Sequence, residues 1–221
     1  MIKACIFDMD GTVADTLTTI AYFANSALER FGLPTIEKET YKKLVGDGAA
    51  KLVRRMLDTV GGPDAVYEEL LKYYNSTYDS DFMYLTAPYE GILSMLEGLK
   101  AHGIKTAIVS NKPDSTTCKI CGELFGGLID CCRGGIEGVP LKPSPQAVIE
   151  TMQELQVSPE ECLYVGDTGT DMETGKNAGI YTIGVLWGFR DEKELRETGA
   201  DLIVSSPAGI LSIATGGERG E

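Results

Sequence analysis

Two aspartates stand close together near the start of the chain, in the sequence Asp8-Met9-Asp10-Gly11-Thr12, directly after an apolar run. In extended backbone, side chains two positions apart point to the same side, so Asp8 and Asp10 face one space. Two adjacent carboxylates repel each other unless a cation or a proton intervenes, and either arrangement is useful in catalysis. A polar turn would also account for these residue types, because aspartate and glycine are common in turns.

Polar residues also follow two later apolar runs. The stretch 110–112, Ser-Asn-Lys, follows the run at 105–109, and the stretch 166–171, Gly-Asp-Thr-Gly-Thr-Asp, follows the run at 162–165. Ligands in open α/β sheets bind at the carboxyl ends of the strands. If the runs are parallel strands, all three polar stretches lie along one edge of the sheet.

Together these residue types suit phosphoryl transfer. The carboxylates that could hold Mg2+, an ion that takes oxygen ligands, belong to Asp8, Asp10 and Asp167. The groups that could hold phosphate oxygens are Ser110, the backbone N–H of Asn111 and Lys142. A carboxylate nucleophile would form an aspartyl-phosphate and so divide one difficult displacement into two steps.

Short apolar runs predict the strands that would position these groups. Nearly continuous apolar character is typical of a parallel sheet that is covered on both faces. The runs are 2–7, 105–109, 162–165, 181–185 and 201–204, with 128–131 as a weaker sixth. Helical spacing at 92–99, 113–125 and 145–155, the last with Ser144 as N-cap and Pro145 in the first turn, alternates with them. The alternation predicts an open α/β fold.

One region breaks the alternation, because 15–83 carries only helical patterns. Several helices without a strand cannot all pack within one crossover, so we interpret this region as an inserted, all-helical domain. Its tyrosines, such as Tyr74 and Tyr78, are assigned to packing. The segments 1–14 and 84–214 then form the core, and the Gly-rich, charged segment 215–221 is expected to be a disordered tail.

The composition excludes several classes of function. A formal net charge of -13 makes the chain a poor candidate for binding nucleic acid or an anionic membrane, which need clustered lysine and arginine. No apolar stretch reaches the ~18 residues of a membrane span. Asp8 interrupts the first apolar run too early for a signal peptide, so we expect a cytoplasmic protein. The six cysteines are interpreted as buried reduced thiols, and the single histidine excludes a histidine-based triad.

The polar stretches, taken in order, resemble the four motifs of the haloacid dehalogenase-like hydrolase superfamily, and the resemblance covers almost the whole chain. It implies a Rossmann-like, mostly parallel sheet with a mobile helical cap. It further implies that Asp8 is the nucleophile and Asp10 the general acid and base. The implied Mg2+ ligands are Asp8, the backbone carbonyl of Asp10 and Asp167, with Thr12 and Asp171 in support.

Within the superfamily, the chain looks like the phosphoglycolate phosphatase branch, on the stretches 45–50, 110–112 and 184–188. The expected partner is a small phosphorylated metabolite, and the protein is expected as a monomer or a homodimer. For the cap we hypothesise that the leaving group of the substrate is recognised by Asp47, Lys51, Arg54 and Arg55. The alternative is that these cations form a solvated basic face. A phosphosugar mutase, a pyrophosphatase, and a phosphorylation-dependent regulatory or binding protein without turnover remain alternatives.

Overall fold

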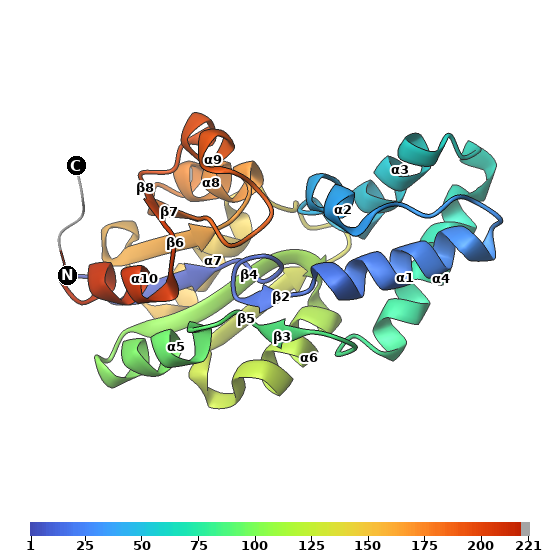
Figure 1. Cartoon of the computed structure of the whole chain (residues 1–221). Helices are drawn as coiled ribbons and strands as arrows, with labels where there is room; N and C mark the ends of the chain where they lie inside the picture. The colour runs from blue at the N-terminus through green and yellow to red at the C-terminus, as the bar shows by residue number, and fades with distance from the viewer. Residues whose placement is uncertain (218–221) are drawn as a thin grey trace.

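The computed structural model describes residues 1–217, and its centre is a six-stranded sheet in the order β5-β4-β1-β6-β7-β8 (Figure 1). Every neighbouring pair in this sheet is parallel. The strands are β1 (Ala4–Phe7), β4 (Lys105–Pro113), β5 (Cys131–Gly135), β6 (Cys162–Gly166), β7 (Tyr181–Val185) and β8 (Leu202–Val204). The α/β fold predicted from the sequence is confirmed.

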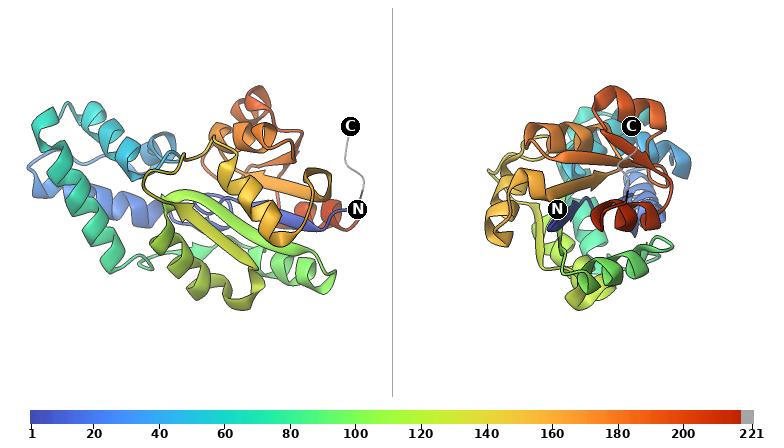
Figure 2. Two further views of the ribbon diagram at one scale, coloured as in Figure 1. Left: turned by 180° about the vertical axis from the view of Figure 1, so that it is seen from behind. Right: turned by 90° about the vertical axis from the view of Figure 1, so that its left-hand side faces the viewer.

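Helices cover both faces of the sheet (Figure 2). Because side chains alternate along a strand, Cys5 and Phe7 of β1 pack on one face with α5, α6 and α10, while Ala4 and Ile6 pack on the other with α7. The helices of the core, counted over both faces, are α5 (Ile92–Ala101), α6 (Asp114–Phe125), α7 (Gln146–Leu155), α8 (Gly169–Asn177), α9 (Glu192–Thr198) and α10 (Pro207–Ala214). Burial of β1 on both faces explains its uninterrupted apolar sequence.

A group of helices stands apart from the sheet and forms a cap (Figure 1). It lies between two short strands, β2 (Ala14–Asp15) and β3 (Ala87–Pro88), which pair antiparallel. The helices are α1 (Leu17–Arg30), α2 (Lys38–Leu44), α3 (Ala49–Val60) and α4 (Tyr67–Ser80), with a 3-10 turn at Asp64–Val66. They enclose an apolar core of their own, so the predicted helical cap is confirmed as an element of the fold.

Several predicted element boundaries are wrong by a few residues. Strand β5 begins at Cys131 rather than at 128, since its ladder with β4 begins at the pair of Ala107 and Cys131. Thr106, just before that pair, bonds to the Leu128 carbonyl and the Asp130 carboxylate. Pro145, not Ser144, is the N-cap of α7. Strand β4 continues to Pro113, so the stretch 110–112 lies within the strand and not after it. The register of β4 against β5 is irregular between Val109 and Pro113, the segment that contains these residues.

No helix of the described residues is long and apolar enough to cross a membrane. All six cysteines, each of which lies in the described part of the chain, are free thiols. Cys5 and Cys162 are buried in the adjacent strands β1 and β6, as predicted, whereas Cys118 and Cys132 are only half-buried. Residues 218–221 of the predicted tail lie outside the described residues.

Candidate active site

The ends of three neighbouring strands bring the predicted site residues together. Phe7, the last residue of β1, is paired with Ile108 of β4 on one side and with Val165 of β6 on the other. Asp8 follows Phe7 and donates its backbone N–H to the Val165 carbonyl at 2.9 Å. Asp8 therefore lies level with the residues that follow Val109 and Val165, at the carboxyl edge of the sheet.

A buried cation lies between two buried carboxylates at this edge. The Lys142 ammonium is 2.8 Å from Asp8 Oδ1 and 2.7 Å from Asp171 Oδ1, and its side chain is only 2% exposed. Burial alone would disfavour the charged ammonium, but the carboxylates of Asp171 and Asp8 outweigh it and hold the pKa of Lys142 well above its usual value. The side chain is thus a fixed positive charge that could pair with a phosphate oxygen.

Asp171 positions this lysine. Its Oδ1 accepts hydrogen bonds from Lys142 Nζ and from the Tyr164 hydroxyl, the latter at 3.2 Å. Its Oδ2 accepts from the Thr168 hydroxyl at 2.6 Å and from the Thr168 backbone N–H at 3.1 Å, at the start of α8. With both oxygens engaged, Asp171 contacts Lys142 and the start of α8 at once.

Asp167 follows β6 and is fully buried. Its Oδ1 accepts from the Thr12 hydroxyl at 2.7 Å, and its Oδ2 accepts from the Phe189 backbone N–H at 2.9 Å. Each oxygen of a carboxylate offers two lone pairs, so both can still bind a cation. These contacts join the loop after β1 to the loop after β7 through one carboxylate.

The carboxylates are crowded enough to attract a cation. Oxygens of Asp8, Asp167 and Asp171 lie within 4.8 Å of one another. Burial, and then the nearby charge of Asp171, raises the pKa of Asp8 to about 7. The same two causes, together with the charge of Asp8, raise the pKa of Asp167 well above its ordinary value. A buried, oxygen-only donor set of this kind suits a hard divalent cation.

Glycine at position 11 allows the loop after β1 to pass the acidic centre. Gly11 has a φ of +87°, a region that favours glycine. A Cβ at this position would come 2.3 Å from Asp167 Oδ2 and 2.8 Å from the Phe189 ring. The absence of a side chain therefore lets Asp167 approach the loop that carries Asp8 and Asp10.

The other predicted groups lie on β4 and on the loop before α7. Ser110 and Asn111 are buried at the end of β4. The Asn111 amide accepts from the Lys142 backbone N–H at 2.8 Å and donates to the Lys142 carbonyl at 3.1 Å, so it fixes the backbone that carries Lys142. It also donates to the Gly46 carbonyl of the cap at 3.2 Å.

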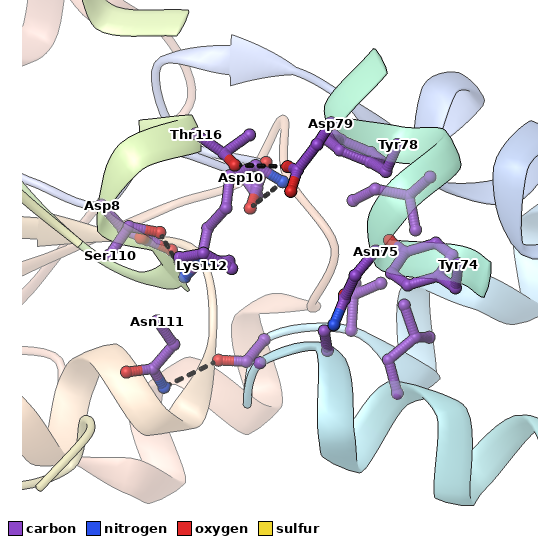
Figure 3. A pocket seen from close by; sticks show the side chains of 17 residues that line it. Asp8, Asp10, Tyr74, Asn75, Tyr78, Asp79, Ser110, Asn111, Lys112 and Thr116 are labelled. Atoms are coloured by element: carbon purple, nitrogen blue, oxygen red, sulfur yellow. Dashed lines mark hydrogen bonds and ion pairs between the residues drawn. The ribbon is translucent and has the colours of Figure 1, made fainter. Parts of the chain in front are cut away.

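Asp10 has a partner that the sequence analysis did not assign. Its Oδ2 is 3.1 Å from the ammonium of Lys112, and this ammonium also lies 4.4 Å from the centre of the Tyr78 ring of the cap helix α4. Asp10 and Lys112 both line a pocket between core and cap (Figure 3). The signal in the sequence was a lysine directly after Ser110 and Asn111 in a strongly acidic chain.

The pocket wall on the cap side differs from the one predicted. Gly46 and Gly48 line it, together with Tyr74, Asn75 and Tyr78 of α4, so these tyrosines do more than pack. The four cap residues that we expected to contact the substrate, Asp47, Lys51, Arg54 and Arg55, do not line the pocket. The three cations among them are paired with acidic residues. Asp47 pairs with Arg55 and Lys51, and Arg54 pairs with Asp64 and stacks on Tyr67 at 4.2 Å.

This fold and site define a class of protein: a parallel-sheet α/β enzyme with a buried carboxylate centre under a helical cap. Residues 5–185 match the family described as haloacid dehalogenase-like hydrolase, and the chain belongs to this family. It is 33% identical to the phosphoglycolate phosphatase of Aquifex aeolicus, over 96% of both chains. It is 31% identical to that of Chromobacterium violaceum, over 98% of both chains.

A solved structure from Lactobacillus delbrueckii subsp. bulgaricus has the same fold, with a TM-score of 0.91 and 31% identity. The match covers 96% of this chain and 98% of that one. The family and the relatives together identify the chain as a hydrolase of the phosphatase type.

Proposed function

We propose that the protein is a Mg2+-dependent phosphatase that hydrolyses a small-metabolite phosphate monoester through an aspartyl-phosphate on Asp8. The observation that carries the proposal is the meeting of Asp8 and Asp167 in one carboxylate cluster, with the buried ammonium of Lys142 at 2.8 Å from Asp8. An anionic phosphate and a carboxylate nucleophile repel each other, so the site needs the positive charge that this arrangement supplies or can recruit.

In the first proposed step, an oxygen of Asp8 attacks phosphorus while the bond from phosphorus to the ester oxygen breaks. Asp10 donates a proton to the departing oxygen, and the alcohol leaves. In the second step, Asp10 takes a proton from water as the water attacks phosphorus, and the bond between phosphorus and Asp8 breaks. Inorganic phosphate is released and Asp8 is regenerated.

The remaining residues orient the reactants. Lys142 and Ser110 hold phosphate oxygens, and Asn111 and Asp171 keep Lys142 in place. Mg2+ bound by Asp8, Asp167 and the main chain at Asp10 would neutralise charge on the phosphate. The fit of this ion is supported by the buried, oxygen-only donor set.

The proposed substrate is phosphoglycolate, and the support is that curated relatives with this activity align over nearly the whole chain. Asp8 and Asp10 line a pocket between core and cap in which we place this substrate. We place the reaction in the cytoplasm.

The test is release of inorganic phosphate from phosphoglycolate with and without Mg2+, for the wild type and Asp8→Asn. We expect activity that disappears with EDTA, returns with Mg2+, and is lost in the variant. Mass spectrometry of the acid-quenched wild type should find one phosphoryl group on the peptide that contains Asp8. Release of phosphate by a folded Asp8→Asn protein at the wild-type rate would overturn the mechanism. A need for a sugar bisphosphate would favour a mutase instead.

A further inference from the structure

The pocket between core and cap contains one cation that the proposed chemistry does not use. Lys112 is the only lysine or arginine among the described residues that line it. Its side chain is 8% exposed, although it comes from a strand that ends at the surface of the core. A buried ammonium is costly unless it is paired, because burial disfavours the charged form.

Lys112 remains charged but is only partly paired. Burial opposes the charged form, but the Asp10 carboxylate lies 3.1 Å from the ammonium and favours it. An ammonium has three donors. Lys142 donates to two carboxylates, whereas Lys112 faces one carboxylate and the Tyr78 side chain, of which it meets both the ring face and the hydroxyl. Lys112 therefore retains the capacity to bind an anion.

Two further donors of the cap line the same pocket. The Tyr78 hydroxyl is buried and interacts with the Lys112 side chain. Asn75 lies three positions earlier on the same face of α4, and Figure 3 shows its amide reaching from the helix into the pocket. The acidic residue beside them, Asp79, already accepts a hydrogen bond from the Thr116 hydroxyl at 2.6 Å.

We propose that Lys112, assisted by Tyr78 and Asn75, binds a carboxylate carried by the leaving group one carbon beyond the ester oxygen. The inference rests on the proposed function and extends it to specificity. A general acid lies within about 3 Å of the oxygen it protonates. Since the Lys112 ammonium is 3.1 Å from Asp10 Oδ2, a substituent on the next carbon falls within its reach.

The same geometry couples recognition to chemistry. Lys112 is paired with Asp10 when no substrate is bound, and the incoming carboxylate competes with Asp10 for the ammonium. Binding of the correct leaving group thus frees the Asp10 carboxylate from this ion pair. A substrate without this carboxylate leaves the Lys112–Asp10 pair intact.

The experiment compares two substrates that differ in one group: phosphoglycolate and 2-hydroxyethyl phosphate, in which a neutral hydroxymethyl replaces the carboxylate. For Lys112→Gln, kcat/KM with phosphoglycolate should fall about 10- to 100-fold more than with 2-hydroxyethyl phosphate, the range expected for a lost charge-assisted hydrogen bond. Tyr78→Phe, which removes one hydroxyl, should shift the same ratio in the same direction by a smaller factor. Lys119→Gln is the control, since Lys119 is exposed on α6 and does not line the pocket.

Equal losses with both substrates, in Lys112→Gln and in Tyr78→Phe, would overturn the inference and assign Lys112 a structural role. A wild type that hydrolyses both substrates equally well would also overturn it, while the phosphatase proposal would stand. A wild type that releases phosphate from neither would overturn the proposed function, and the inference with it.

Discussion

At the scale of single residues, the carboxylates at the carboxyl edge of the sheet repel one another, and Lys142 offsets only part of this repulsion when no metal ion is bound. The pKa of Asp8 is raised to about 7 by burial and by the charge of Asp171, so the folded protein holds a proton there more tightly than the unfolded chain. Below the ordinary pKa of an aspartate, both states are protonated and the crowding costs nothing. As pH rises toward 7, the unfolded chain ionises first and the folded state loses stability.

We therefore expect the protein in EDTA to be less stable at pH 8 than at pH 5.5, and Mg2+ to raise the stability at pH 8 more than at pH 5.5. Each 1 kcal/mol should appear as about 2–4 °C in Tm for a chain of this size. Thermal unfolding followed by circular dichroism, with and without Mg2+, measures both effects. Asp8→Asn, which cannot ionise, should weaken the pH dependence. A Tm in EDTA that rises between these two pH values would contradict the crowding argument.

Gly11→Ala should disable the acidic centre by a steric route. The added Cβ meets the Asp167 carboxylate at 2.3 Å, so either Asp167 or the loop that carries Asp8 and Asp10 must move. We expect loss of most activity and a higher Mg2+ requirement, measured by phosphate release over a range of Mg2+ concentrations.

Gly103→Ala is the matched control for Gly11→Ala. Gly103 also has a positive φ, +70°, but a Cβ there would meet nothing within 4 Å. Both variants carry the backbone strain, but only Gly11→Ala carries the clash. Equal effects on activity would show that strain alone accounts for the result.

The meeting of Asp8, Asp10 and Asp167 at one sheet edge could be predicted from the sequence, because parallel strands with polar ends determine it. The pairing of Asp10 with Lys112 could not. It depends on an irregularity of β4 between Val109 and Pro113 and on how closely the cap helix α4 approaches. Both are properties of packing between segments distant in the sequence, and no local pattern reports them.

At the scale of elements, one core loop holds the cap segment that borders the pocket. The Arg190 guanidinium, in the loop after β7, donates to the carbonyls of Lys42 and Val45 at the end of α2 and pairs with Glu194 of α9. Gly46, which lines the pocket, directly follows Val45. Arg190 thus fixes the backbone from which Gly46 and Gly48 extend over the site.

Arg190→Lys keeps the charge but removes the planar set of donors that reaches two carbonyls at once. We expect KM for phosphoglycolate to rise and kcat/KM to fall roughly 10-fold, in line with the loss of a hydrogen bond from a charged group. Steady-state kinetics measure both constants. Arg196→Lys is the control, since Arg196 on α9 is an exposed arginine that pairs with Glu192 of its own helix. Equal kinetics for both variants would exclude Arg190 as a support of the cap segment.

The order and type of the elements could be read from the sequence, because buried strands and amphipathic helices have distinct periodicities. The cations of the cap show what the helical spacing could not predict. Lys51, Arg54 and Arg55 do share a region of α3, as helical spacing requires, but Asp47 and Asp64 neutralise them outside the pocket. Helical spacing determines the face of a helix on which residues lie, and only the tertiary structure determines what that face meets.

At the scale of the whole molecule, the cap covers the acidic centre. Asp8, Lys142 and Asp167 are 6%, 5% and 0% exposed, so the centre offers a substrate little open surface in this arrangement. Cap and core meet through separate polar contacts, among them Thr116 with Asp79 and Thr170 with Asp47. The chain passes between the two parts only beside the short strands β2 and β3. This construction predicts that the cap must swing away from the core in every catalytic cycle.

A disulfide between cap and core should therefore stop turnover reversibly. The side chains of Asp79 on α4 and Thr116 on α6 are in direct contact, so we expect that Asp79→Cys/Thr116→Cys can form a cross-link with little movement of either helix. The oxidised double variant should lose nearly all phosphatase activity, and a reductant should restore it to the level of the reduced protein. Each single variant, treated with the same oxidant, controls for the native thiols, including Cys118 two positions from Thr116. Full activity in a double variant whose cross-link is verified by mass spectrometry would show that substrate enters and product leaves without opening of the cap.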